Sequence, residues 1–432
     1  MDNRINPVLR IRENLSPVTL RKRLERTQQM LKEKNLPALI MQRDWQNADR
    51  WLNNIYSFGM PAGGWYIVPA EGIAWATNGF RIEEGGRASG REGLALYDDT
   101  GELVNWLTDC DLLDMLGDRL NRDGMEYDHD LKSVRSGNAK LITGFGREDL
   151  REILAGQNEI GVVDPNNMRC DLYDELTASF PNIRLVDVTE DYAVLQAVKE
   201  PDEIQDFREI ARQHDQILEG ALAALRPEET EREVATRARY LAYHFGCAGF
   251  NWKTAAEVRL FSAPSEHDIL ESDLMYPGRT LKAGDRLSIR VSAMGTSGYF
   301  GMISRSFLLG KMDKAAESKW QDAVEATELC AEGLRPGNTL EAAGRETVKM
   351  LKGKGYEVPA AGFIHSLGNS PNQLPRYGHS TEKKELEAGM ILAVCPPVGR
   401  KGRMPDCCGD MYLVTDHGAE RMTQFSRELI CR

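Results

Sequence analysis

The stretch LSIRVSAMGTSGYFGMISRSFLLG, residues 287–310, predicts a hairpin of two β-strands. In its first half, apolar residues at 287, 289 and 291 alternate with polar residues at 288, 290 and 292. A period of two places Arg290 on the second of these faces, and the same alternation in the second half adds Met302 and Ser304 to it. The residues that contact this face must come from other parts of the chain.

Length and composition predict two globular domains. A chain of 432 residues exceeds what one hydrophobic core usually serves, and 41% hydrophobic and 28% charged residues are ordinary globular proportions. A formal net charge of −12 argues against nucleic acid as a partner, because phosphate contacts need a basic excess. The chain has no apolar leader and no run of ~18 apolar residues. We therefore expect a cytoplasmic protein with no membrane partner.

Strands alternate with helices in the first part of the chain. A helical pattern with Pro17 at its first position precedes the strand-like runs PALIMQ, GWYIVPA and EIGVVD, which predicts an α/β domain at residues 1–195. Two long amphipathic helical segments then precede the hairpin. Two more helical segments and the strands around GMILAVCPP and GDMYLVTD follow it, which predicts an α+β domain at residues 196–432.

The order of these signals resembles the creatinase, prolidase and methionine-aminopeptidase family. The motifs that carry the resemblance are AVKEPDEIQDFREIA, LKAGDRLSI, LRPGNT, IHSLGNSP, LEAGMILAVCPP and LVTDHGAERMT. The resemblance implies a pita-bread fold for the C-terminal domain, preceded by the N-terminal domain of creatinase and prolidase. A shared fold leaves the activity open.

Metallopeptidases of this family hold two metal ions with five ligands, and the resemblance gives each ligand a position here. The two aspartates fall at Arg290 and Met302, the histidine at His365, and the two glutamates at Cys395 and Gly409. Hard divalent ions need anionic oxygen ligands. We therefore expect no metal, no cofactor and no metallopeptidase activity.

The pattern is similar in character to the metal-free creatinase branch of the family. HSLG at His365 matches the creatinase form of its motif, and Arg376 coincides with a carboxylate-binding arginine. Phe58, in YSFGMP, matches an aromatic residue on the loop that reaches the neighbouring subunit, so the resemblance implies a homodimer. The two guanidinium-binding glutamates fall at Ser304 and Cys395, which would leave a bound guanidinium unpaired and excludes creatine itself.

Two residues on the predicted site face each have two interpretations. Arg290 would hold an anionic substrate through its planar guanidinium, or it would form an internal ion pair with Asp410. His365 would act as a general base or as a donor to an oxyanion, or a backbone carbonyl would satisfy it.

Flanking segments supply further candidates. The catalytic histidine of creatinase falls at Asp273, and His267 is the alternative because the segment before it is longer here; a solvated loop position is the simpler interpretation of either residue. Arg376 and Tyr377 would bind a substrate carboxylate, or they would belong to a solvated loop.

Three cysteines are expected to border the same face. Cys395, Cys407 and Cys408 would supply a nucleophilic thiol near His365, or soft-metal ligands together with it. Buried small hydrophobes are the commoner role of free cysteines.

These observations predict a metal-independent hydrolase of a non-peptide C–N bond in a small carboxylate-bearing compound. His365, helped by His267 or Asp273, would move protons. The expected substrate contacts are Arg290, Arg376, Phe58, Ser304, Cys395 and Tyr377. Two alternatives stay open: a metal-free lyase acting on a small zwitterion, and a non-catalytic binding protein that retains the fold. The expected partners are a small molecule and a second copy of this chain.

Overall fold

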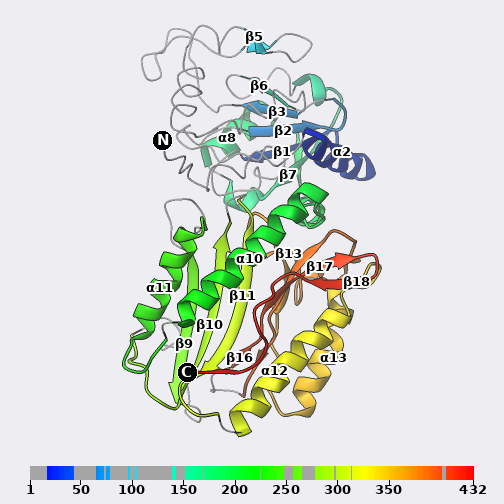
Figure 1. The fold of residues 1–432 in the computed structure, drawn as a ribbon. Coiled ribbons are helices and arrows are strands. Elements are labelled where there is room, and N and C mark those ends of the chain that lie inside the picture. The colour runs from blue at the N-terminus through cyan, green and yellow to red at the C-terminus, as the bar shows by residue number, and fades with distance from the viewer. Residues whose placement is uncertain are drawn as a thin grey trace, which may run out of the picture. The chain divides into compact units, whose positions relative to one another are not determined.

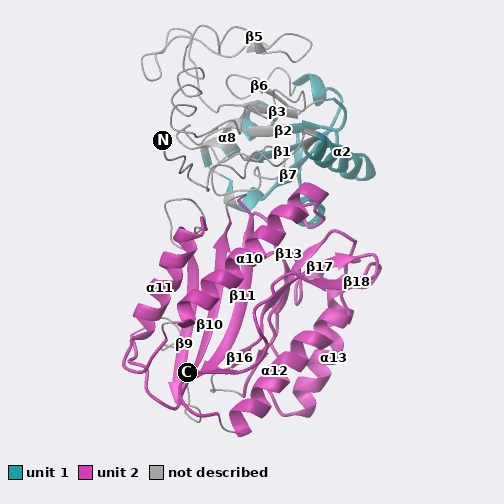
Figure 2. Cartoon of the chain, viewed as in Figure 1, with its two compact units in different colours: residues 1–195 teal, residues 196–432 magenta. Residues whose placement is uncertain are grey.

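The structure is a computed structural model of the chain. It describes residues 17–42, 65–72, 74–77, 96–97, 103–104, 139–142, 151–168, 170–223, 225–247, 256–264, 278–295, 298–312, 314–400 and 405–432. The chain divides into two compact units, residues 1–195 and 196–432 (Figure 2). Among the described residues, no helix has the length and apolar character needed to cross a membrane.

A six-stranded mixed sheet forms the described part of the first unit, in the order β6-β3-β2-β1-β7-β8. Its strands are β1 (Ala38–Gln42), β2 (Trp65–Pro69), β3 (Ala74–Thr77), β6 (Ala139–Ile142), β7 (Glu159–Val163) and β8 (Arg184–Asp187). A separate short pair joins β4 (Leu96–Tyr97) to β5 (Leu103–Val104). The helices are α2 (Pro17–Glu33), η2 (Pro165–Asn167), α8 (Cys170–Ser179) and α9 (Thr189–Leu195).

Strand β1 buries both of its faces. Leu39 and Met41 lie in one apolar cluster with Leu31 of α2, whereas Ala38 and Ile40 lie in a second cluster that includes residues of α8. Helices on both faces explain why PALIMQ is apolar at successive positions. The predicted α/β character of this part of the chain is confirmed.

The second unit contains two main sheets. The first has the order β19-β11-β10-β9 and the second has the order β13-β12-β14-β17-β18. Their strands are β9 (Glu257–Pro264), β10 (Asp285–Met294), β11 (Phe300–Leu308), β12 (Ile364–Ser366), β13 (Gln373–Arg376), β14 (Ile391–Val394), β17 (Asp410–Thr415), β18 (Gly418–Arg421) and β19 (Ile430–Cys431). A small hairpin joins β15 (Pro397–Val398) to β16 (Asp406–Cys407).

Helices cover the outer face of each sheet in this unit (Figure 1). The helices are α10 (Pro201–Ala223), α11 (Glu231–His244), α12 (Lys314–Glu332), α13 (Leu340–Gly353) and η4 (Ser380–Lys383). Residues of α10 and α11 share a core with β9, β10 and β11, and residues of α12 and α13 share cores with β12, β14 and β17. The α+β fold expected for this part of the chain is confirmed.

The hairpin predicted at residues 287–310 is formed by β10 and β11. Its antiparallel register sets Arg290 opposite Ser304 and Ser292 opposite Met302, so these side chains share one face. Met302 lies in a core that also contains residues of β14 and β17, so this face looks toward the second sheet. The shared face predicted for Arg290 and Met302 is confirmed.

A buried acidic residue joins the two sheets. Asp410, at the start of β17, accepts hydrogen bonds from Arg305 Nη2 of β11 at 2.7 Å and from Arg427 Nε at 2.8 Å. Thr423 Oγ1 donates to the same carboxylate at 2.7 Å. Burial alone would raise the pKa of Asp410, but the neighbouring arginines outweigh it and lower that pKa. These bonds link β11, β17 and the C-terminal segment.

The ion pairs of Asp410 exclude one of the two interpretations of Arg290. An ion pair between Arg290 and Asp410 was one interpretation, but the ion pairs of Asp410 are with Arg305, Arg421 and Arg427. Arg305 lies opposite Ile289 in the β10–β11 pair, and Ile289 is the neighbour of Arg290. Because successive side chains of a strand point to opposite faces, Arg305 and Arg290 lie on opposite faces of this sheet. The positive charge of Arg290 is therefore not neutralised by Asp410.

Replacing Asp410 with Asn should lower the free energy of unfolding of the second unit by about 3–5 kcal/mol, because it leaves buried Arg305 without its counter-charge. Urea unfolding followed by tryptophan fluorescence measures the change. Glu420→Gln is the matched control, since Glu420 pairs with Arg208 at the surface and should cost no more than about 1 kcal/mol. Equal losses in the two variants would contradict a special role for Asp410.

Candidate active site

Five side chains form a polar cluster between the two sheets of the second unit. We call Arg290, Ser304, His365, Arg376 and Cys395 the arginine–histidine cluster. Arg290 faces Ser304 across β10–β11, and His365 faces Arg376 across β12–β13. Arg290 Nη2 lies 3.4 Å from His365 Nε2, which joins the two strand pairs.

A backbone bridge holds Ser304 and Cys395 in this cluster. Ser304 and Gly409 exchange two hydrogen bonds, of 3.1 and 2.8 Å, between β11 and the residue before β17. A Cβ atom on Gly409 would lie 2.8 Å from the sulfur of Cys395. Glycine is therefore required at this position, because any side chain would displace the thiol from its place beside Ser304.

His365 is a neutral, buried imidazole. Desolvation lowers its pKa to about 4, and the positive charges of Arg290 and Arg376 lower it in the same direction. Nδ1 lies 3.2 Å from the carbonyl oxygen of Ser366, so Nδ1 carries the hydrogen and donates to that oxygen. Nε2 then has a free lone pair and accepts from Arg290.

The two arginines of the cluster have no acidic partner among the described residues. Arg290 contacts His365, and neither Arg290 nor Arg376 forms an ion pair with any residue that the structure describes. Nε of Arg376 is buried and has no hydrogen-bond partner within the described part of the chain. Two guanidinium groups beside a neutral imidazole create a net positive site, which favours a bound anion.

The thiol of Cys395 responds to the same charges. Its pKa is lowered, chiefly because the thiol of Cys407 hydrogen-bonds to it, and also by Arg290 and by the hydroxyl of Ser304. Burial opposes these effects. The contact between Cys395 and Cys407 was not predicted, although both cysteines were expected near this face. Their separation of twelve residues across a short hairpin is the signal that could have revealed it.

Other predicted site residues lie apart from the cluster or outside the described residues. His267, Asp273 and Phe58 lie outside the described residues. Tyr377 packs against Phe363, with ring centroids 4.2 Å apart, and its ring limits the space at Gly344 of α13. Tyr377 therefore belongs to the core under α13, whereas its neighbour Arg376 lies across from His365.

Cys408 is also separate from the cluster. It lies in the core with Trp320 of α12, and burial raises the pKa of its thiol to about 12. Strand alternation explains the difference from Cys407, because successive side chains point to opposite faces. The expectation that all three cysteines border one site is therefore wrong for Cys408.

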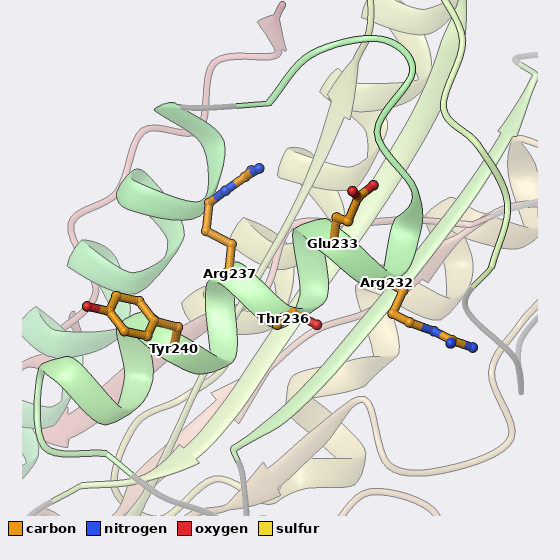
Figure 3. A pocket seen from close by; sticks show the side chains of 5 residues that line it. All are labelled: Arg232, Glu233, Thr236, Arg237 and Tyr240. Carbon is orange, nitrogen blue, oxygen red and sulfur yellow. The ribbon is translucent and has the colours of Figure 1, made fainter.

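A surface hollow of about 550 Å³ lies along α11 (Figure 3). It is lined by Arg232, Glu233, Thr236, Arg237 and Tyr240. None of these residues belongs to the arginine–histidine cluster. We place the chemistry at the cluster, because it combines buried polar groups, unpaired positive charge and a perturbed histidine, whereas the hollow is a solvated helix face.

Comparisons with known proteins identify relatives of the second unit. Residues 205–416 match the model of metallopeptidase family M24. The Xaa-Pro dipeptidase of Pyrococcus furiosus is 26% identical over 258 residues, which are 57% of this chain and 68% of that protein. An uncharacterised peptidase of Staphylococcus aureus is 25% identical over 237 residues, which are 54% of this chain and 64% of that protein.

Solved structures share the fold over almost the whole chain. The Xaa-Pro dipeptidase of Bacillus anthracis has a TM-score of 0.69 at 16% identity and covers 96% of this chain and 100% of its own. Aminopeptidase P of Escherichia coli has a TM-score of 0.66 at 15% identity and covers 95% of each chain. At these identities the likeness shows the fold, and it confirms the pita-bread architecture.

These comparisons correct the functional prediction. A metal-independent, creatinase-like hydrolase of a non-peptide C–N bond was expected, but the relatives found are Xaa-Pro dipeptidases and peptidases. The same finding contradicts the expectation that metallopeptidase activity is excluded, and it replaces the lyase and binding-protein alternatives. Membership of the creatinase branch is not shown.

The donor groups of the cluster do not fit a pair of divalent metal ions. The positions that the resemblance assigned to ligands hold Arg290, Met302, His365, Cys395 and Gly409. Within the described part of the chain, no group of three or more His, Cys, Asp or Glu side chains could hold a metal ion. A guanidinium repels a cation, and a thioether and a glycine offer no anionic oxygen.

Replacing Arg290 with Met should raise the pKa of His365 from about 4 part of the way toward its usual 6.5, because one neighbouring positive charge is removed while desolvation remains. Histidine ring NMR shifts followed against pH measure the change, with His365→Gln to assign the signal. Arg212→Met on the surface of α10 is the control and should leave the pKa of His365 where it is.

The sign of the pH dependence follows from the same pKa. The folded-state pKa of His365 lies below 6.5, so the unfolded chain binds the proton more tightly. The stability that neutral His365 contributes is therefore present above pH 6.5 and is lost as the pH falls toward 4. An unchanged His365 pKa in Arg290→Met would contradict the contact between the two side chains.

Proposed function

We propose that this chain, whose second unit belongs to metallopeptidase family M24, acts on short peptides that end in a free carboxylate. The relatives named Xaa-Pro dipeptidase support this substrate class. In a dipeptide, the free C-terminal carboxylate lies only one residue away from the peptide bond. One observation carries the proposal. The guanidinium groups of Arg290 and Arg376 flank neutral His365 and have no carboxylate of the described chain as partner.

The charge balance of the cluster favours a carboxylate ligand. Arg290 and Arg376 are each partly buried, and a partly desolvated cation gains most from an anion that reaches it with two oxygens. A planar guanidinium matches a carboxylate through two parallel N–H···O bonds. A ligand carboxylate would also satisfy Nε of Arg376, which is buried and finds no hydrogen-bond partner in the described ranges.

His365 positions the arginine rather than carrying charge itself. Its Nε2 accepts from Nη2 of Arg290, and its Nδ1–H donates to the carbonyl oxygen of Ser366. The imidazole therefore fixes one edge of the guanidinium and leaves the remaining N–H groups for a ligand. A lowered pKa keeps the ring neutral at physiological pH, so it adds no third positive charge.

The homodimer and the role of Phe58 belong to this proposal. The resemblance implies that the loop around Phe58 completes the site of a second copy of this chain, and a small-molecule substrate fits the same arrangement. Phe58 lies outside the described residues, so its role stays a prediction, as does a location in the cytoplasm.

Binding of an Xaa-Pro dipeptide should depend on the charge of Arg290. Isothermal titration calorimetry with Ala-Pro and with its C-terminal amide tests this. Arg290→Met should weaken Ala-Pro binding at least roughly tenfold, about 1.4 kcal/mol, because a charge-assisted pair is lost. Arg290→Lys should lie between the two, since it keeps the charge and loses the planar fork.

Two controls separate recognition from a general loss of structure. Arg212→Met removes an exposed arginine that pairs with Glu209, and it should bind Ala-Pro as the unmodified protein does. The amide should bind the unmodified protein about as weakly as Ala-Pro binds Arg290→Met. Equal affinity of the unmodified protein for the dipeptide and its amide would remove the carboxylate from the proposal.

Proline release tests the cleavage part of the proposal. Purified protein incubated with a panel of Xaa-Pro dipeptides, with Mn²⁺ and after chelation, should release free proline, measured by amino-acid analysis. Release in either condition supports a peptidase. Binding of the dipeptide without release in either condition would contradict cleavage and leave recognition of the peptide carboxylate standing.

A further inference from the structure

Two cysteines meet beside the positive cluster. Cys395 follows β14, and Cys407 ends β16, where it lies opposite Pro397, two residues after Cys395. The apolar core that contains Cys395 also has Cys407 packed against it. Both cysteines are free thiols. The function proposed above uses Arg290 and leaves this thiol pair without a role.

The backbone holds the pair in place from three directions. The amide of Cys395 donates to the carbonyl oxygen of Phe363 at 2.8 Å, and the amide of Cys407 donates to Ser306 Oγ at 3.4 Å. Cys407 is paired with Pro397 in the β15–β16 hairpin. Gly409 leaves the space that the sulfur of Cys395 occupies. The strand pairing and the shared core therefore bring the two cysteines to the same place in the fold.

The surroundings distinguish Cys395 from the other buried cysteines. Arg290 and the hydroxyl of Ser304 both favour its thiolate, in addition to the hydrogen bond from Cys407. Burial instead raises the pKa of the Cys247, Cys330 and Cys408 thiols to about 12. Cys407 is partly exposed, which gives a small reagent a route to the pair.

We propose that Cys395 and Cys407 form a reactive dithiol that a hydroperoxide converts to an intramolecular disulfide. The sulfur of Cys395 attacks one oxygen of the peroxide, so an S–O bond forms, the O–O bond breaks and the second oxygen leaves as water after taking a proton. The sulfur of Cys407 then attacks the resulting sulfenic acid. An S–S bond forms and a second water leaves.

The electrons and atoms balance in this sequence. Each sulfur loses one electron overall, and the two electrons reduce one hydrogen peroxide to two waters. The protons come from the two thiols. A thiol reductant of low molecular mass reverses the change by exchange with the disulfide. This inference does not depend on the proposed function, because the reaction requires no bound peptide.

The experiment treats the full-length, reduced protein with hydrogen peroxide and counts free thiols after denaturation. Two thiols per chain should be lost and should return with dithiothreitol. Trypsin cuts after Arg400 and Arg403, so Cys395 and Cys407 fall in separate peptides, and mass spectrometry should find these peptides joined. Fragmentation of the joined peptides distinguishes Cys407 from Cys408, which lies in the same peptide.

Three variants assign the two steps. Cys395→Ser should lose no thiols at the same peroxide dose. Cys407→Ser should stop at a sulfenic acid on Cys395, which dimedone traps. Cys408→Ser is the matched control, because its thiol is adjacent in sequence and lies in a different core, and it should behave as the unmodified protein does.

Peptide mapping of the unmodified protein keeps the test decisive even if a variant fails to fold. A disulfide mapped to any other pair of cysteines would overturn the proposal. So would retention of all thiols at a peroxide dose that fully oxidises glutathione under the same conditions.

Discussion

The ion pair between Asp410 and Arg305 is the constraint on which the second unit depends. It is fully buried, and it joins β17 to β11 at the point where the two sheets meet. Arg427 and Thr423 complete the shell of donors around the carboxylate. A buried carboxylate with this many donors has no capacity left for Arg290. The positive charge of the site is therefore a consequence of how the core is assembled.

The same assembly sets the chemistry of the neighbouring residues. Gly409, directly before Asp410, bridges to Ser304 and makes room for the sulfur of Cys395. Arg290 then acts on two groups: it lowers the pKa of His365 by like charge with the protonated ring, and it lowers the pKa of Cys395 by attraction to the thiolate. The guanidinium of Arg290, which forms no ion pair with the described residues, thus links the proposed peptide site and the dithiol.

The family match suggests a metallopeptidase, whereas the side chains at the ligand positions do not fit a pair of metal ions. Residues 205–416 match the model of metallopeptidase family M24, and solved Xaa-Pro dipeptidases share the fold. The positions that would bind metal in such a unit carry a guanidinium, a thioether and a glycine in place of carboxylates. From these positions we predicted a metal-independent, creatinase-like hydrolase; the peptidase relatives contradict that activity, and the creatinase branch is not shown. The lack of carboxylates is a local property, whereas overall similarity relates this chain to proteins named Xaa-Pro dipeptidase.

The sequence by itself determined the two-part organisation of helices and strands, the hairpin at residues 287–310 and the face that carries Arg290. These follow from hydrophobic periodicity, which is local and which packing did not override. Tertiary structure alone decided which carboxylate pairs with which arginine, that Tyr377 points into the core under α13, and that Cys407 rather than Cys408 meets Cys395. Such contacts join residues far apart along the chain, so no local pattern specifies them. A shift of one residue in strand register would move each of these side chains to the other face of its sheet.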